Sequence, residues 1–138
     1  MFVTIDLARL TGGKMTGEIE ISAHGWETRY SWGHTAEVSA NYRTISRAKF
    51  RYYNRTWEGY RFQSVIHHAL YGYVHSVLGI NPCKPICKRD TAPMKSPAAE
   101  TRRLARVAAY EFAVTLYKRL TGFVDGKVSY ADFERATA

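Results

Sequence analysis

The sequence predicts an α+β fold in which an N-terminal antiparallel β-sheet packs against two main α-helices, with a short helix at the C-terminus. Three observations support it: two-residue alternation of apolar residues in the first third of the chain, and two later runs with apolar residues at helical spacing. The 138 residues suit a single domain. A composition of 46% hydrophobic and 23% charged residues is that of a globular chain.

The sheet is expected within residues 2–53. Residues 2–9 alternate imperfectly and predict a strand, which the Gly12–Gly13 pair ends. Alternation on both sides of Gly25 predicts a hairpin that turns at this glycine, and residues 36–42 predict a further strand.

Residues 47–53 alternate strictly, so one face of this strand is apolar and the other is mainly basic. The apolar face holds Ala48, Phe50 and Tyr52, and the basic face holds Arg47, Lys49, Arg51 and Tyr53. Like charges at successive same-face positions repel one another, so acidic neighbours, solvent or an anionic partner must offset them. The pattern is compatible with a solvated edge strand and with a strand that faces an anion.

The first helix is expected over residues 56–78, with Thr56 as its N-cap and Gly79 as its stop. Its apolar side holds Phe62, Ile66, Ala69, Leu70, Tyr73 and Val77, and its opposite side holds Trp57, Arg61, Ser64, His68 and His75. One side therefore suits a protein core, whereas the other combines rings, histidines and an arginine.

The second helix is expected over residues 97–121, because Ser96 and Pro97 form a strong start signal and Gly122 follows as a stop. Its apolar stripe consists of Ala105, Ala109, Phe112, Leu116 and Leu120, widened by Val107, Tyr110, Val114 and Tyr117. This width predicts a mostly buried helix. A short final helix is expected over residues 129–137, with Ser129 as its cap.

Three arginines lie in the first turns of the second helix: Arg102, Arg103 and Arg106. Positive charge is unfavourable at a helix N-terminus, and Glu100 offsets part of its cost. These arginines are candidates for contact with a phosphate or an acidic partner. A solvated cluster is the alternative.

The segment of residues 79–96 is expected to be a loop, because it contains prolines and no apolar periodicity. A loop of this length in a compact domain calls for a metal, a binding role or mobility. Cys83 and Cys87 form a C-x3-C pair that follows His75, which predicts a structural zinc site. The fourth ligand stays open among His67, His68, His24, His34 and Asp90. Two free thiols, or a disulfide, are the alternatives.

Signals for an enzyme are poor. The sequence contains no glycine-rich phosphate loop, no nucleophile elbow and no H-E-x-x-H motif. A cysteine and a histidine could imitate a nucleophile and its base, but nothing in the sequence orients such a pair. We therefore expect a protein that is not an enzyme.

The formal net charge of +8 favours anionic partners, although it is also compatible with simple solubility. The predicted partner-binding residues are Arg47, Lys49, Arg51, Tyr53, Arg55 and Arg61, together with Arg102, Arg103 and Arg106. Basic and aromatic residues of this kind bind nucleic acid by phosphate pairing and base stacking, and they also anchor protein–protein interfaces. No segment approaches the roughly 20 apolar residues of a membrane span, and the N-terminus lacks a signal-peptide pattern, so a cytosolic location is expected.

The block KFRYYNRTWEGYRFQSV, residues 49–65, resembles a loose group of short proteins from bacteriophages and mobile elements. The resemblance implies a small accessory protein in the cytoplasm of a bacterial host, serving replication, host takeover or anti-defence. Anti-CRISPR proteins are one such class. Many of these are acidic DNA mimics, and the charge of +8 departs from that pattern. A basic member would grip an effector protein or its guide RNA.

Two binding functions follow. The first is a stoichiometric anti-defence inhibitor, resembling an anti-CRISPR protein, that engages a nucleoprotein effector such as a Cas protein. The alternative is a direct DNA- or RNA-binding protein of phage or mobile-element origin.

Overall fold

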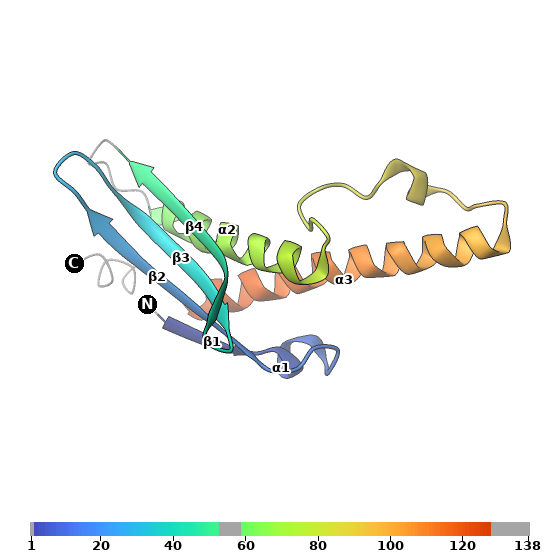
Figure 1. The fold of residues 1–138 in the computed structure, drawn as a ribbon, viewed down its shortest axis with the longest axis horizontal. Coiled ribbons are helices and arrows are strands. Elements are labelled where there is room, and N and C mark those ends of the chain that lie inside the picture. The colour runs from blue at the N-terminus through green and yellow to red at the C-terminus, as the bar shows by residue number, and fades with distance from the viewer. Residues whose placement is uncertain (1, 53–58, 128–138) are drawn as a thin grey trace.

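The computed structural model describes residues 2–52 and 59–127, and the side chains of 59–62 and 127 lie outside the description. The strands are β1 (Phe2–Asp6), β2 (Glu18–Glu27), β3 (Trp32–Ala40) and β4 (Arg43–Tyr52). The helices are α1 (Leu7–Thr11), α2 (Gly59–Leu78), the short 3-10 helix η1 (Lys88–Thr91) and α3 (Pro97–Lys127) (Figure 1). The α+β class and the N-terminal antiparallel sheet are confirmed.

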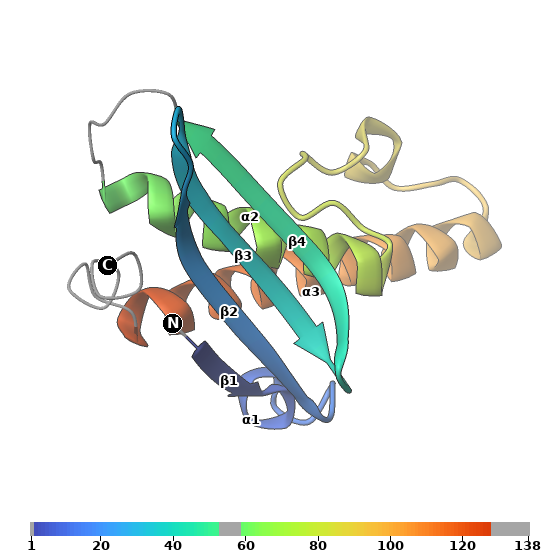
Figure 2. The same ribbon diagram turned by 60° about the vertical axis from the view of Figure 1, so that its left-hand side comes forward.

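The four strands form an antiparallel sheet in the order β1-β2-β3-β4. Both main helices lie on one side of it, with α2 against β4 and β3, and α3 against α2 (Figure 2). The opposite side, which we call the open face, carries no described helix. A two-layer arrangement follows because each strand has one apolar face to bury.

The core lies between the sheet and the two helices. In the register, Ile21 pairs with Val38, and Ala36 with Ala48, so these side chains point to the same face. The fully buried large side chains are Ile5, Ile19, Ile21, Val38, Val65, Ile66, Leu70, Leu116 and Leu120, with His34. Alternation therefore sends apolar residues to the helices and polar ones to the open face.

The predicted turn at Gly25 is wrong, because β2 runs through this glycine and pairs it with His34. The chain turns at residues 28–31 instead. There the Thr28 N–H donates to the Ser31 carbonyl oxygen at 2.7 Å, and the Ser31 N–H donates to Thr28 Oγ1 at 3.1 Å. Short hydroxyl side chains can also form a turn, by hydrogen bonding to the backbone, so the glycine did not mark the turn here.

The first strand is shorter than predicted. It ends at Asp6, whose carboxylate accepts a hydrogen bond from the Ala8 N–H at 3.0 Å and so caps α1. The predicted strand at 36–42 is the second half of β3. Asn41 and Tyr42 follow it with positive φ values of 52° and 64°, which suit a two-residue hairpin turn.

The start of α3 and the end of α2 agree with the sequence. Gly79 stops α2 with φ of 69°, and its N–H donates to the His75 carbonyl oxygen at 2.9 Å. Pro97 begins α3. The predicted cap Thr56 and the predicted helix at 129–137 lie outside the described residues.

The second helix differs from its prediction in length and in burial. It continues past Gly122 to Lys127, because Val124 is buried in the core and one helical glycine costs only about 1 kcal/mol. Its first half is largely exposed, with Leu104 at 53%. This half extends beyond the end of the sheet, where the segment after α2 is the described neighbour (Figure 1).

Two glycines give opposite expectations for the same substitution. We predict that Gly33→Ala lowers the free energy of unfolding by about 1–3 kcal/mol, because the added methyl group has no room and forces its neighbours to shift. The added Cβ would lie 1.9 Å from the Phe50 carbonyl oxygen and 2.6 Å from Trp26 Cζ2. Urea denaturation followed by circular dichroism measures the change.

The matched control is Gly122→Ala in α3, where nothing lies within 4 Å of an added Cβ. This variant should gain up to about 1 kcal/mol, because alanine favours a helix over glycine. Equal effects at the two positions would contradict the close approach described for Gly33.

Candidate functional site

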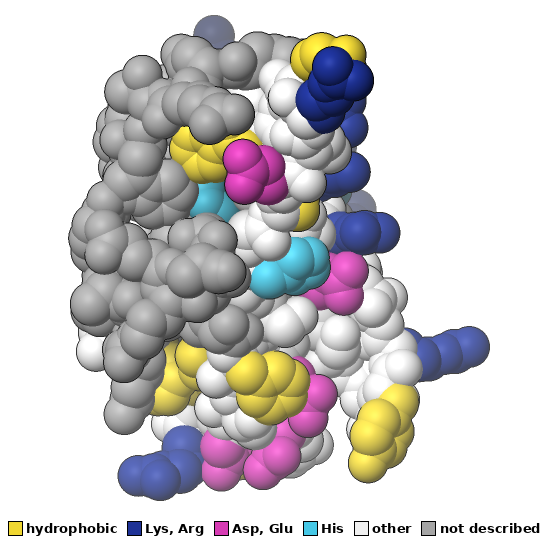
Figure 3. All heavy atoms as spheres, turned by 90° about the vertical axis from the view of Figure 1, so that its left-hand side faces the viewer, with side chains coloured by type: hydrophobic (Ala, Val, Ile, Leu, Met, Phe, Trp, Pro, Cys, Tyr) yellow, Lys and Arg dark blue, Asp and Glu magenta, His cyan; other side chains and the backbone are white. Residues whose placement is uncertain are grey.

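The basic face predicted for residues 47–53 lies on the open face of the sheet. Arg47, Lys49 and Arg51 are exposed, while Ala48, Phe50 and Tyr52 between them are partly buried toward the helices. The alternation predicted for the described part of this strand is therefore present. We call the three cations the basic ridge. Figure 3 shows Lys and Arg side chains in a column down the right-hand edge of the molecule.

A tryptophan from β2 contacts two of the three cations of the basic ridge. Trp26 pairs in register with Gly33, and Gly33 pairs with Arg51, so all three lie in one row across the sheet. The indole covers the glycine, whose missing side chain makes room for it. Lys49 Nζ lies 4.8 Å from the ring centroid, and Arg51 Cζ lies 5.3 Å from it. Both cations thus rest on the negative face of the ring.

The ridge is only partly neutralised by the chain itself. Arg47 Nε lies 3.2 Å from Glu37 Oε1 on β3, in a pair that solvent screens because 61% of the arginine side chain is exposed. Within the described part of the chain, Lys49 and Arg51 make no ion pair with a carboxylate. Two neighbouring cations are therefore held together with their charges available to a partner.

The remainder of the open face is acidic or neutral. His24 on β2 is exposed and lies in the row of Thr35 and Lys49. Carboxylates occupy the far part of the face, with Glu20 and Glu18 on β2 and Asp6 on β1. Positive charge is thus confined to one edge strand of the sheet.

The arginines at the start of α3 have partners within the protein. Arg103 Nε donates to Glu100 Oε2 at 3.0 Å, and its Nη1 donates to the Asp90 carbonyl oxygen at 3.0 Å. Arg106 makes two hydrogen bonds to Asp90 Oδ1, at 3.0 and 2.7 Å. Glu100 also accepts the Met94 N–H at 2.6 Å. We call these four charged residues the loop clamp, because they hold the segment before α3 against the helix.

The hydrogen bonds of the loop clamp lower the pKa of both of its carboxyl groups. Hydrogen bonding to Arg103 lowers the pKa of Glu100 to about 2, and hydrogen bonding to Arg106 lowers the pKa of Asp90. Arg102 is exposed. Sequence reasoning missed the Asp90–Arg106 pair because no local pattern joins a loop residue to a helix position sixteen residues later.

Three further members of the predicted partner set cannot be placed in the site. Tyr53 and Arg55 lie outside the described residues, and Arg61 is described only as part of the α2 backbone. Trp26 is the residue that the prediction of the partner surface omitted. Its place in the site depends on the pairing of β2 with β3. The turn predicted at Gly25 would have ended β2 before Trp26.

The structure does not bring the predicted zinc ligands together. Cys83 and Cys87 are exposed free thiols, and His75 lies against Tyr71, with 5.9 Å between the ring centroids. Burial, followed by the Cys83 thiol, raises the pKa of Tyr117 to about 12. Structural zinc stays a prediction from the sequence.

The other proposed ligands also lie apart. His24 is on the open face, and His34 is buried between Trp32 and Tyr52, where burial lowers its pKa to about 4. His67 Nε2 lies 2.9 Å from Asp125 Oδ1, and His68 packs against Phe50. Across residues 2–52 and 59–127, no group of three or more His, Cys, Asp or Glu is placed to hold a metal ion.

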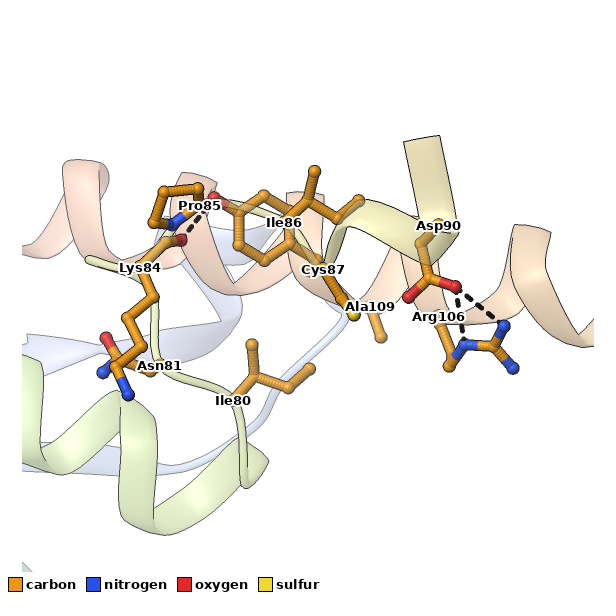
Figure 4. A pocket seen from close by; sticks show the side chains of 10 residues that line it. Ile80, Asn81, Lys84, Pro85, Ile86, Cys87, Asp90, Arg106 and Ala109 are labelled. Carbon is orange, nitrogen blue, oxygen red and sulfur yellow. Dashed lines mark hydrogen bonds and ion pairs between the residues drawn. The ribbon is translucent and has the colours of Figure 1, made fainter. Parts of the chain in front are cut away.

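The loop and α3 line an open cavity of about 320 Å³. Its lining is mainly apolar, with Ile80, Ile86 and Ala109 on facing sides. The Asp90–Arg106 pair closes one end, and the Cys87 sulfur lies near Ala109 (Figure 4). Tyr110 donates its hydroxyl to the Lys84 carbonyl oxygen at 2.7 Å and fixes the opposite wall.

Comparison with known proteins gives no relative: neither a family model, nor a curated protein, nor a solved structure matches the chain. Among the described helices, none has the length and apolar character required to cross a membrane.

The loop clamp predicts a loop that detaches at low pH. The pKa of Glu100 is about 2 in the folded protein against 4.5 for the free side chain, so its stabilising effect is complete above about pH 4.5. This effect is lost as the pH falls through 2, and Asp90 acts in the same direction. Amide hydrogen exchange of residues 83–94, corrected for the intrinsic pH dependence of exchange, should accelerate over this range before that of β2 and β3.

Asp90→Asn should reproduce the effect at neutral pH, because it removes the charge that Arg106 and Arg103 face. Glu111→Gln on the exposed side of α3 is the matched control and should leave loop exchange unchanged. Loop protection that survives both Asp90→Asn and acid would show that the clamp does not hold the segment.

Proposed function

We propose that this protein acts by stoichiometric binding and that the basic ridge contacts the phosphodiester backbone of a nucleic acid. One observation carries the proposal: Lys49 and Arg51 are held side by side over the Trp26 ring, on the open face, with no carboxylate partner in the described chain. Lysine and arginine supply most of the affinity of proteins for nucleic acid through phosphate contacts.

Protection of an edge strand is the simplest competing explanation, because charged residues on an edge prevent strands of other molecules from pairing. That role requires only that cations project from β4. It does not require a tryptophan from β2, two strands away, to draw them over the face of the sheet. The position of Trp26 therefore favours a surface that receives a ligand.

The biological setting of the proposal comes from the resemblance of residues 49–65 to short phage and mobile-element proteins. In this setting the ligand is the RNA or DNA displayed by a nucleoprotein effector of a host defence system, in the bacterial cytoplasm. The protein would then inhibit by occupying the strand, without turnover. Direct binding to free nucleic acid is the simpler form of the same chemistry.

Fluorescence anisotropy with a labelled oligonucleotide tests the proposal. We expect the double substitution Lys49→Glu with Arg51→Glu to weaken binding at least about tenfold, because each lost charge-assisted contact contributes on the order of 1.5–3 kcal/mol. Affinity of the original protein should also fall linearly with the logarithm of salt concentration.

The matched control is Lys88→Glu with Lys95→Glu, which changes the net charge equally in the segment beside α3, where both side chains are exposed. Equal losses in the two variants would mean that only total charge matters, and the ridge would not be the site. For the effector, the protein should form a defined complex on size exclusion that Lys49→Glu with Arg51→Glu disrupts. A complex unaffected by these substitutions would contradict the proposed contact.

A further inference from the structure

We infer that the ligand of the basic ridge is a single nucleic-acid strand that runs along β4, and that the open face rejects a duplex. This inference rests on the proposed function and specifies its substrate. It follows from the spacing of the cations, from the charges on the other three strands and from the orientation of Trp26.

The spacing suits consecutive phosphates. Arg47, Lys49 and Arg51 are every second residue of an uninterrupted stretch of β4, so their neighbouring Cα atoms are about 7 Å apart, and the ridge is about 14 Å long. Adjacent phosphates of an extended single strand have a similar separation. A strand parallel to β4 can therefore place one phosphate on Lys49 and the next on Arg51, the two cations of the ridge without a carboxylate partner among the described residues.

The charge distribution disfavours a second backbone. The cations of the ridge are all on β4. Each of the other three strands carries at least one carboxylate on the same face: Glu37 on β3, Glu20 on β2 and Asp6 on β1. The four strands span about 14 Å. The opposite backbone of a duplex lies about 12 Å away across the major groove. A duplex laid along the ridge with that groove toward the sheet would bring its second row of phosphates over these carboxylates.

The tryptophan is not a platform for bases. Its Cζ2 atom lies against Gly33, and the two cations Lys49 and Arg51 lie over the ring, 4.8 and 5.3 Å from its centroid, so a stacked base would have to displace a cation. Base stacking requires a free ring face. The ridge therefore contacts the backbone of the strand, and its binding should depend little on base sequence.

The experiment compares an oligothymidylate of about 15 nucleotides, long enough for one such site, with the same strand annealed to its complement. We expect at least about tenfold tighter binding of the single strand, a preference of one order of magnitude in Kd. A plot of log K against log salt for the single strand should have a slope of about −1.4, from two phosphates at roughly 0.7 each.

A second variant tests the carboxylates themselves. Glu18→Gln with Glu20→Gln removes two negative charges from the open face and leaves the Arg47–Glu37 pair intact. Duplex affinity should rise more than single-strand affinity. The control Glu111→Gln, on α3, removes a carboxylate outside this face and should not change the ratio of the two affinities.

The outcomes separate the two proposals. Equal affinity for strand and duplex, with both sensitive to Lys49→Glu and Arg51→Glu, would overturn the single-strand inference and leave the proposed function standing. No measurable binding of either oligonucleotide would overturn both. A duplex preference, or a ratio that does not respond to loss of Glu18 and Glu20, would also contradict the inference, provided that circular dichroism shows an unchanged fold.

Discussion

The burial of one face of the sheet against α2 and α3 is the constraint on which the rest of the structure depends. Successive side chains of a strand point to opposite faces, so fixing Ile21 and Val38 in the core also fixes which residues reach the open face. A one-residue slip of β4 would place its cations against the helices, where their charge is costly. The position of the basic ridge is thus a consequence of core packing.

Features with a local cause could be predicted from the sequence. The alternation of β4, the stop at Gly79 and the start at Pro97 each depend on a few neighbouring residues. The contacts of Trp26 and Asp90 could not be predicted, because each joins segments whose relative position is set by tertiary packing. Two predictions made from glycine were wrong, the turn at Gly25 and the helix end at Gly122, because neighbouring contacts outweighed the preference of glycine for turns.

The two arginine-rich regions show that residue type alone does not identify a binding surface. Arg103 and Arg106 belong to a sequence cluster as basic as the ridge, yet they bond to Glu100 and Asp90 and hold a loop. That clamp accounts for the order of a proline-containing segment through contacts of the chain itself. The cations of β4 differ because the nearest carboxylate, Glu37, pairs with only one of them. Charge becomes available to a partner where the fold leaves it unmatched.

Placing cations over an aromatic ring changes what binding costs. A free lysine or arginine loses side-chain entropy when a ligand fixes it, and this loss reduces affinity. Lys49 and Arg51 already rest on Trp26, which is itself seated on the backbone at Gly33. Part of their ordering is therefore complete before a ligand arrives. The same two cations lie over the ring that a base would need, so the indole that organises phosphate binding is not open to stacking on a base. Pre-organised affinity for a backbone and indifference to its sequence thus have a single physical cause.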